Sequence, residues 1–179
     1  MRLFVAIDLP ETVAGQARAL CQGLAGAHWG NPDQLHLTLR FLGEVPEDRV
    51  TWLRTQLEAV ARAPFDLGLR GVGVFPRQRR PARVLWAGVA PAEPAVALKV
   101  AIDGALGPDP EAAERGFSPH LTLARFRSDP GPALDRYLGV HGSFAGAPWT
   151  VDAFLLYRST LGSDGARHEI LQRYPLRAR

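Results

Sequence analysis

The sequence predicts an α+β fold with two lobes, in which two antiparallel or mixed sheets face each other across a central groove and helices lie outside. Strand-like and helix-like segments follow one another in the order β-α-β-α-β-β-α-β-α-β-β. The tetrapeptide His-Leu-Thr-Leu occurs at residues 36–39 and again at residues 120–123. Because one copy falls in each half of the chain, we expect one copy in each lobe of a single domain that spans residues 1–179.

Four segments have the features of helices. Residues 10–26 begin with Pro-Glu-Thr, and their apolar residues recur at three- and four-residue intervals. Residues 46–62 begin with Pro-Glu-Asp, which places a proline at the start and carboxylates in the first turn. Similar signals predict helices at residues 94–106 and 131–138.

The expected strands are short apolar or alternating runs bounded by glycine, proline or polar turn residues. In one of them, Phe65, Leu67 and Leu69 share one phase of the alternation. The predicted strands are residues 2–8, 35–42, 65–75, 84–89, 120–126, one or two strands within 144–157, and 169–176.

The composition is that of an ordinary globular protein, with 46% hydrophobic and 22% charged residues. No apolar run approaches the length of a membrane span, and the N-terminal segment reads as a first strand rather than a signal peptide. The single cysteine, Cys21, excludes an internal disulfide and a thiolate metal cluster, and we expect it to be a buried, inert thiol. We therefore expect a cytoplasmic protein without membrane association.

The repeated motif places a histidine and a threonine on one face of each strand. Side chains two residues apart on a strand point the same way, so His36 projects with Thr38, and His120 projects with Thr122. The leucines between and beside them point to the opposite face, which we expect to be buried. A single His-x-Thr on a strand is most often only a half-exposed strand, but two identical copies indicate a functional site.

Two imidazoles on opposite sides of one reacting atom can act as a general base and a general acid, since histidine titrates near neutral pH. In-line displacement at phosphorus needs this arrangement, with the base behind the nucleophile and the acid behind the leaving oxygen. The threonine hydroxyls can donate hydrogen bonds to the non-bridging oxygens. This chemistry needs no metal or other cofactor, and the sequence has no obvious set of metal ligands.

Three residues beyond the motifs test the strand geometry. Strict alternation would turn Arg125 and Phe41 away from the groove, so Arg125 can reach a phosphate only if the strand twists, bulges or ends near Ala124. An unpaired arginine in an apolar core is costly, so we expect Arg125 to contact phosphate rather than to form a surface ion pair. Phe41 could stack on a nucleobase, but we expect a core aromatic. Arg40 shares the phase of His36, so it either lines the groove or ends the strand in solvent.

The formal net charge is only +3, so any contact with a nucleic acid would come from a local cluster of basic residues. One segment holds four arginines, either as RNA contacts or as solvated surface: Arg77, Arg79, Arg80 and Arg83. The remaining histidines, His28, His141 and His168, lack the motif context, and we expect them on the surface or in loops.

These motifs resemble the 2H phosphoesterase superfamily, whose members carry two His-x-Thr/Ser-x motifs. Within it, the chain is similar to the bacterial and archaeal RNA 2',3'-cyclic phosphodiesterases, also called 2'-5' RNA ligases. The resemblance covers essentially the whole chain, including residues 2–7, 36–43, 75–77, 84–88, 118–125 and 170–176. One departure is His168, where a tyrosine is common.

The resemblance implies a role for each matching residue. His36 and His120 would be the catalytic acid–base pair, Thr38 and Thr122 would hold the phosphate oxygens, and Arg125 would contact the phosphate. Water would attack phosphorus, expel the 3'-oxygen and leave a 2'-phosphomonoester. We favour His120 as the base and His36 as the acid, although two identical motifs do not assign these roles.

Four functions remain open at this point. The leading one is metal-independent hydrolysis of RNA that ends in a 2',3'-cyclic phosphate, with tRNA fragments among the conceivable substrates and a monomer as the expected form. The reverse reaction, 2'-5' ligation, would use the same histidines. The alternatives are a non-catalytic module that binds RNA ends and a phosphodiesterase for small cyclic nucleotides.

Overall fold

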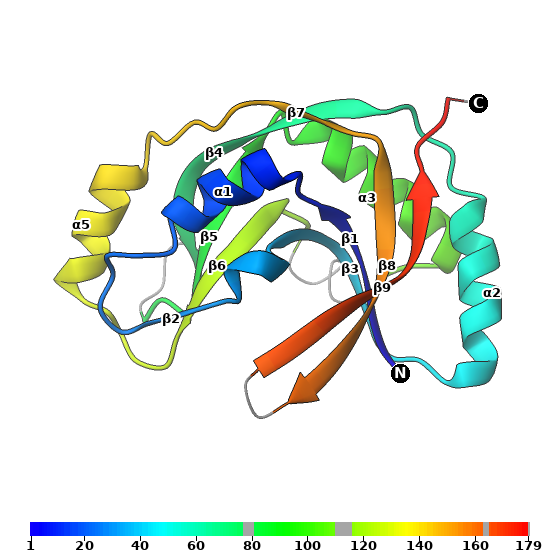
Figure 1. Ribbon diagram of the computed structural model, residues 1–179, viewed down its shortest axis with the longest axis horizontal. Coiled ribbons are helices and arrows are strands. Elements are labelled where there is room, and N and C mark those ends of the chain that lie inside the picture. Colours follow the sequence, from blue (N-terminus) through cyan, green and yellow to red (C-terminus); the bar gives the residue numbers. More distant parts are fainter. Residues whose placement is uncertain (77–80, 110–115, 163–164, 179) are drawn as a thin grey trace.

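The computed structural model describes residues 1–76, 81–109, 116–162 and 165–178. Nine strands form one curled sheet in the order β7-β4-β5-β6-β3-β1-β8-β9, with β2 paired to β6. All of these strand pairs in the described residues are antiparallel. Figure 1 shows α5 and α2 at opposite ends of the molecule, and the β8–β9 hairpin projecting from the sheet.

The elements follow the expected alternation along the chain. The strands are β1 (Arg2–Asp8), β2 (Ala27–Trp29), β3 (His36–Glu44), β4 (Phe65–Phe75), β5 (Val84–Ala90), β6 (His120–Phe126), β7 (Trp149–Val151), β8 (Ala153–Gly162) and β9 (Gly165–Pro175). The helices are α1 (Glu11–Ala19), the 3-10 turn η1 (Pro32–Gln34), α2 (Glu47–Glu58), α3 (Glu93–Leu106) and α5 (Pro132–His141).

The predicted α+β class is confirmed, and the two expected sheets are the two halves of one sheet. They join where β3 meets β6 at a single Cα pair, Leu37 with Leu121. Both leucines are fully buried, as are Leu39 and Leu123. The apolar face of each motif therefore lies in the hydrophobic core, and this burial leaves the histidine–threonine face directed away from that core.

Strand β1 is buried on both of its faces. Leu3, Val5 and Ile7 belong to the main core. Phe4 and Ala6 pack on the other face in a second, smaller cluster with Leu155 and Tyr157 of β8. This second cluster lies under the first motif, because β1 pairs with β3 along its whole length.

The segment after β1 differs from the expectation of one helix over residues 10–26. Helix α1 ends at Ala19, and it cannot continue to residue 26 because Gly23 and Gly26 adopt left-handed φ angles of 77° that a helix does not tolerate. The turn-rich segment that follows contains β2, which the sequence did not reveal because three residues are too few to show alternation. Cys21 lies just beyond α1 and is half-buried, and burial raises the pKa of its thiol to about 11, as expected for an inert cysteine.

Candidate active site

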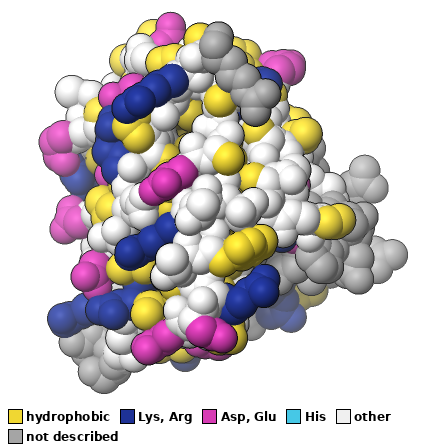
Figure 2. Space-filling model, turned by 90° about the vertical axis from the view of Figure 1, so that its right-hand side faces the viewer, with side chains coloured by type: hydrophobic (Ala, Val, Ile, Leu, Met, Phe, Trp, Pro, Cys, Tyr) yellow, Lys and Arg dark blue, Asp and Glu magenta, His cyan; other side chains and the backbone are white. Residues whose placement is uncertain are grey.

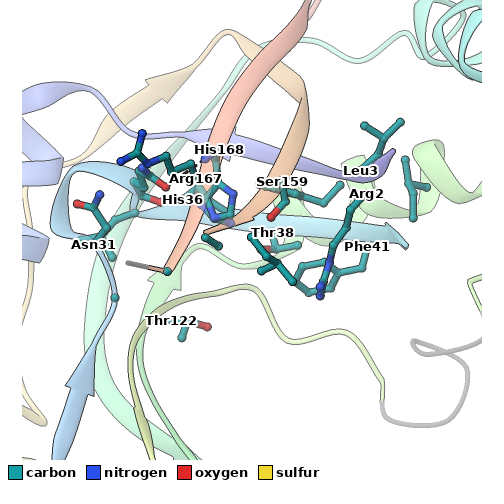
Figure 3. A pocket seen from close by; sticks show the side chains of 18 of the residues that line it. Arg2, Leu3, Asn31, His36, Thr38, Phe41, Thr122, Ser159, Arg167 and His168 are labelled. Atoms are coloured by element: carbon teal, nitrogen blue, oxygen red, sulfur yellow. Dashed lines mark hydrogen bonds between the residues drawn. The ribbon is translucent and has the colours of Figure 1, made fainter. Parts of the chain in front are cut away.

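A groove of about 1070 Å³ opens beside the first motif, where β1, β3, β6 and the β8–β9 hairpin meet. Four of the five predicted site residues line it: His36, Thr38, Thr122 and Arg125. Figure 3 shows His36 and Thr38 on one side of the pocket and Thr122 across from them. His120 is not among the lining residues of this groove; it begins β6, two positions before Thr122 and on the same face.

The register between β3 and β6 relates the two motifs by an approximate two-fold axis. The strands are antiparallel and pair at Leu37 and Leu121, the second residue of each motif. In that register His36 lies across from Thr122, and Thr38 lies across from His120. Each histidine therefore faces the threonine of the other motif, as the two-lobed arrangement requires for a site shared between the halves.

Both motif histidines are held in the same way by the chain that precedes them. The Nδ1 of His36 lies 2.8 Å from the carbonyl oxygen of Gln34, and the Nδ1 of His120 lies 2.7 Å from that of Ser118. A carbonyl oxygen only accepts hydrogen bonds, so Nδ1 carries the proton in each ring. Nε2 is then the nitrogen that can exchange a proton with a substrate.

Aromatic rings surround His36. Phe4 stacks on it at 4.8 Å between ring centroids, and Tyr157, which also stacks on Phe4, lies 5.9 Å from His36. His168 meets the imidazole edge-on at 5.3 Å. Burial lowers the pKa of His36 to about 4; the hydrogen bond to Gln34 opposes this shift and His168 adds to it. His36 is therefore neutral at pH 7 in the free protein.

His120 has an aromatic neighbourhood of its own. Phe75 at the end of β4 meets it edge-on, with 5.0 Å between ring centroids, and Trp86 of β5 lies at 6.5 Å. In both histidines, Nδ1 donates to a main-chain carbonyl oxygen two residues earlier. The aromatic rings around each imidazole come from different strands.

A β-bulge in β6 turns Arg125 toward the groove. The pairing with β5 runs from Leu85 opposite Ala124 to Trp86 opposite Thr122, so Leu123 is an extra residue. Leu123 and Ala124 are consequently both buried, while Arg125 is exposed and lines the groove. The expected bulge near Ala124 is present.

The first motif strand carries a bulge at the equivalent leucine. Against β1, Val5 pairs with Arg40 and Ala6 pairs with Thr38, which makes Leu39 the extra residue. Phe41 is 55% exposed and lines the groove, so the expectation of a core aromatic was wrong. The bulge explains the error, since it reverses the phase of the side chains that follow it, up to the second register shift at Leu42.

The same bulge determines the surroundings of Arg40. Its guanidinium lies 3.1 Å from the carboxylate of Asp103 on α3 and donates to the carbonyl oxygen of Gly107 at 2.6 Å. Asp103 also binds the buried Lys99, whose ammonium contacts Asp109 at 2.7 Å. Arg40 lines the groove. Its ion pair with Asp103 links β3 to α3, so Arg40 is not a solvated strand end.

His168 is the site residue that the sequence analysis missed. We expected a surface or loop histidine, whereas it lies in β9, lines the groove and contacts both His36 and Phe4. The side-chain oxygen of Gln34 accepts a hydrogen bond from its main-chain N–H at 3.2 Å, which ties the hairpin to the segment that clamps His36. The one available signal was the departure from tyrosine at this position.

The other two histidines and the four arginines of the basic segment lie outside the groove lining or outside the described residues. His28 is exposed on β2, and His141 packs on Tyr137 at the end of α5. Of the four arginines in the basic segment, Arg77, Arg79 and Arg80 lie outside the described residues. Arg83 is exposed and donates to the carbonyl oxygen of Arg127 at 3.0 Å.

Two features are absent from the described residues: a cluster of metal ligands and a helix that could span a membrane. No group of three or more His, Cys, Asp or Glu side chains among them is arranged to hold a metal ion. No helix in this part of the chain is long and apolar enough to cross a membrane.

The fold and the paired histidine–threonine motifs define a two-histidine phosphoesterase, and comparisons with known proteins identify the family. The family described as LigT like Phosphoesterase matches residues 7–86. An RNA 2',3'-cyclic phosphodiesterase of Thermus thermophilus is 35% identical over 99% of this chain and 91% of its own length. One from Thermotoga maritima is 32% identical over 96% and 93%.

Solved structures agree with the sequence relatives. A crystal structure of a Thermus thermophilus protein matches with a TM-score of 0.79 and 33% identity over the whole of both chains. Escherichia coli LigT complexed with 3'-AMP matches with a TM-score of 0.75 and 28% identity over 98% of both chains. The chain belongs to the family of LigT-like phosphoesterases.

Proposed function

We propose that this protein is an RNA 2',3'-cyclic phosphodiesterase, which opens a terminal 2',3'-cyclic phosphate to a 2'-phosphomonoester. The pairing of Leu37 with Leu121 is the observation that carries the proposal, because it sets each motif histidine across from the threonine of the other motif. Relatives that match more than nine tenths of both chains bear the same name.

The two histidines would divide the proton transfers between them. Nε2 of His120 takes a proton from the attacking water, and Nε2 of His36 gives a proton to the departing 3'-oxygen. His36 must be protonated for this step, although burial holds its pKa at about 4 in the free protein. The phosphate anion brings an opposite charge beside the ring and raises that pKa on binding.

The remaining groups would hold the substrate. Thr38 and Thr122 donate hydrogen bonds to the non-bridging phosphate oxygens, and the guanidinium of Arg125 balances the charge that develops on them. Phe41 supplies an exposed aromatic face in the same groove, on which the terminal nucleobase can stack.

The competing functions differ in what they require of this site. An RNA-end-binding module would not need two histidines whose Nδ1 is bound to a carbonyl oxygen, which leaves Nε2 to exchange a proton. Ligation uses the same groups in reverse, and water in excess favours hydrolysis. We propose action in the cytoplasm as a monomer, with RNA ends such as those of tRNA fragments as substrates.

The test uses an oligoribonucleotide that ends in a 2',3'-cyclic phosphate, incubated with the protein in EDTA. Chromatography then resolves the product into 2'- and 3'-phosphates. We expect the 2'-phosphate alone. Tight binding without any product would favour the end-binding module, and a 3'-phosphate would mean that the substrate lies in the groove in the opposite orientation.

A further inference from the structure

Exposed hydrophobic side chains gather at one end of the groove. Among the described residues, Phe41 is 55% exposed and Leu161 of β8 is 69% exposed, and both line the groove. Met1, 37% exposed, lies with Leu161 in the lining of a second hollow. Solvent-exposed apolar groups clustered beside a binding site indicate a surface that a ligand covers.

The second hollow continues the groove. It has a volume of about 500 Å³ and shares Arg2, Ser159 and Leu161 with the groove. Figure 3 shows Arg2, Phe41 and Ser159 at the same end of the pocket, away from Asn31 and Arg167. The groove alone, at about 1070 Å³, reaches the upper limit of about 1,000 Å³ typical of sites for drug-sized ligands. Together the two hollows suit a ligand longer than one nucleotide.

The shared wall of the two hollows is basic. Arg2 makes no ion pair with any described residue, in contrast to Arg40 and Lys99, which are bound by aspartates. Arg158, at the far wall of the second hollow, keeps 43% of its side chain exposed while pairing with Glu169 at 2.7 Å. Glu44 also lines this hollow, where it lies 3.6 Å from the N-terminal amine.

The opposite kind of surface is seen on the side of the molecule that carries α2. There, basic and acidic side chains are interspersed, and no uninterrupted basic strip crosses the face (Figure 2). An exposed aromatic ring, exposed aliphatic groups and an arginine without an ion pair to any described residue occur together along the path from the groove to the second hollow. Stacking surfaces beside arginines suit single-stranded RNA.

We propose that the second hollow is a subsite for the nucleotide that precedes the cyclic-phosphate end of a single-stranded RNA. The inference rests on the proposed function and extends it. With the terminal nucleobase on Phe41, the preceding ribose and base pass over Leu161, and the phosphate between the two nucleotides meets Arg2. The register of β1 with β3 supports this path. Phe4 pairs with Phe41, and Arg2, two positions before Phe4, pairs with Glu44 near the end of β3, so Arg2 lies close to Phe41 on the way to the second hollow.

The experiment compares two substrates that share one reacting end: adenosine 2',3'-cyclic phosphate and a penta-adenylate ending in the same group. We expect the parent protein to cleave the pentamer with a kcat/KM roughly tenfold higher, as stacking of one further base implies. Arg2→Gln and Leu161→Ser should each remove most of this preference by raising KM for the pentamer. Arg136→Gln, on α5 and exposed, is the matched control.

Salt dependence provides a second readout. For the pentamer, the slope of log(kcat/KM) against log[salt] should become shallower by about 0.7 in Arg2→Gln, the value for one lost phosphate contact with a single strand. Leu161→Ser should leave the slope as it is in the parent, because leucine carries no charge.

Fluorescence anisotropy with a labelled pentamer that ends in a 2'-phosphate separates this inference from the proposed function. If the parent cleaves neither substrate but Arg2→Gln and Leu161→Ser weaken pentamer binding, the proposed function fails and the subsite stands. If the parent cleaves both substrates and the two variants leave the preference and the binding unchanged, the subsite is wrong. Equal losses on both substrates would also overturn it.

Discussion

Leu37 and Leu121 are the Cα partners through which β3 and β6 meet, and each is the second residue of a His-Leu-Thr-Leu motif. This one pair joins the two halves of the sheet and brings four polar side chains to the same side of it. Because both leucines are fully buried, the core fixes the register of the motifs, and a slip by one residue would turn the histidines into the core.

Truncation of one of these leucines should therefore destabilise the protein. We expect Leu121→Ala to lower the free energy of unfolding by about 2–5 kcal/mol, the usual cost of a core leucine. Leu161→Ala is the matched control, with an expected change within about 0.5 kcal/mol because that leucine is 69% exposed. Urea unfolding measures both. Equal stabilities would contradict the central position of the Leu37–Leu121 pair.

The threonine hydroxyls should matter for the reaction more than for the fold. Thr38→Val and Thr122→Val keep the side-chain shape and remove the donor, so we expect kcat to fall by about 10²-fold, as for the loss of one donor to a developing oxyanion. Thr55→Val on α2 serves as the control, since its hydroxyl donates to the carbonyl oxygen of Thr51. Steady-state kinetics on the cyclic-phosphate oligonucleotide give the comparison, and parental kcat in both motif variants would exclude this role.

The bulge at Leu123 predicts different results for two nearby arginines. Arg125→Gln should reduce kcat/KM by roughly 10–100-fold, and Arg125→Lys should restore only part of the loss, because an ammonium cannot bind two phosphate oxygens as a guanidinium does. Arg127→Gln should match the parent, since Arg127 follows β6 and does not line the groove. A larger loss for Arg127→Gln than for Arg125→Gln would mean that the arginines face the other way.

The depressed pKa of His36 makes stability depend on pH. The folded-state pKa of about 4 lies below the ordinary 6.5, so the unfolded chain binds the proton more tightly. The protein should lose up to about 3 kcal/mol of stability as the pH falls from 6.5 to 4, and none of this effect should appear above pH 7. His168, whose pKa burial also lowers, contributes in the same direction.

Urea unfolding of the parent and of His36→Gln at pH 7 and at pH 4.5 measures this contribution. The difference in stability between the two pH values should be smaller in His36→Gln, because glutamine does not titrate. An identical pH dependence in the two proteins would show that His36 is not desolvated in the folded state.

Much of the site could be predicted from the alternation of side chains along the two motif strands. His36 with Thr38, and His120 with Thr122, share a face because nothing interrupts either strand between them. The reasoning failed for Phe41, where the extra residue Leu39 reverses the alternation. No single residue type signals such a bulge. Arg125 was expected on the groove face because an unpaired arginine in the core would be too costly and because the family resemblance places an arginine at the phosphate.

His168 was beyond sequence reasoning for a different reason. It reaches His36 across 132 positions of the chain, through the β8–β9 hairpin and a hydrogen bond from its main chain to Gln34. Local patterns predict which elements form, and only the packing of the hairpin decides which end of it meets the groove. The helix α1 was predicted too long because the glycines that follow it interrupt the local periodicity, and β2 was missed because three residues are too few to show alternation.

The most direct test of the account measures the hydrolysis rate in EDTA for the parent, His36→Ala, His120→Ala and the control His141→Ala, with folding checked by circular dichroism. We predict that each motif variant loses about 10²–10⁴-fold in kcat, as for the removal of a general acid or base, while His141→Ala keeps the parental rate. If either motif variant, correctly folded, retained the parental rate, the two histidines would not act as a catalytic pair.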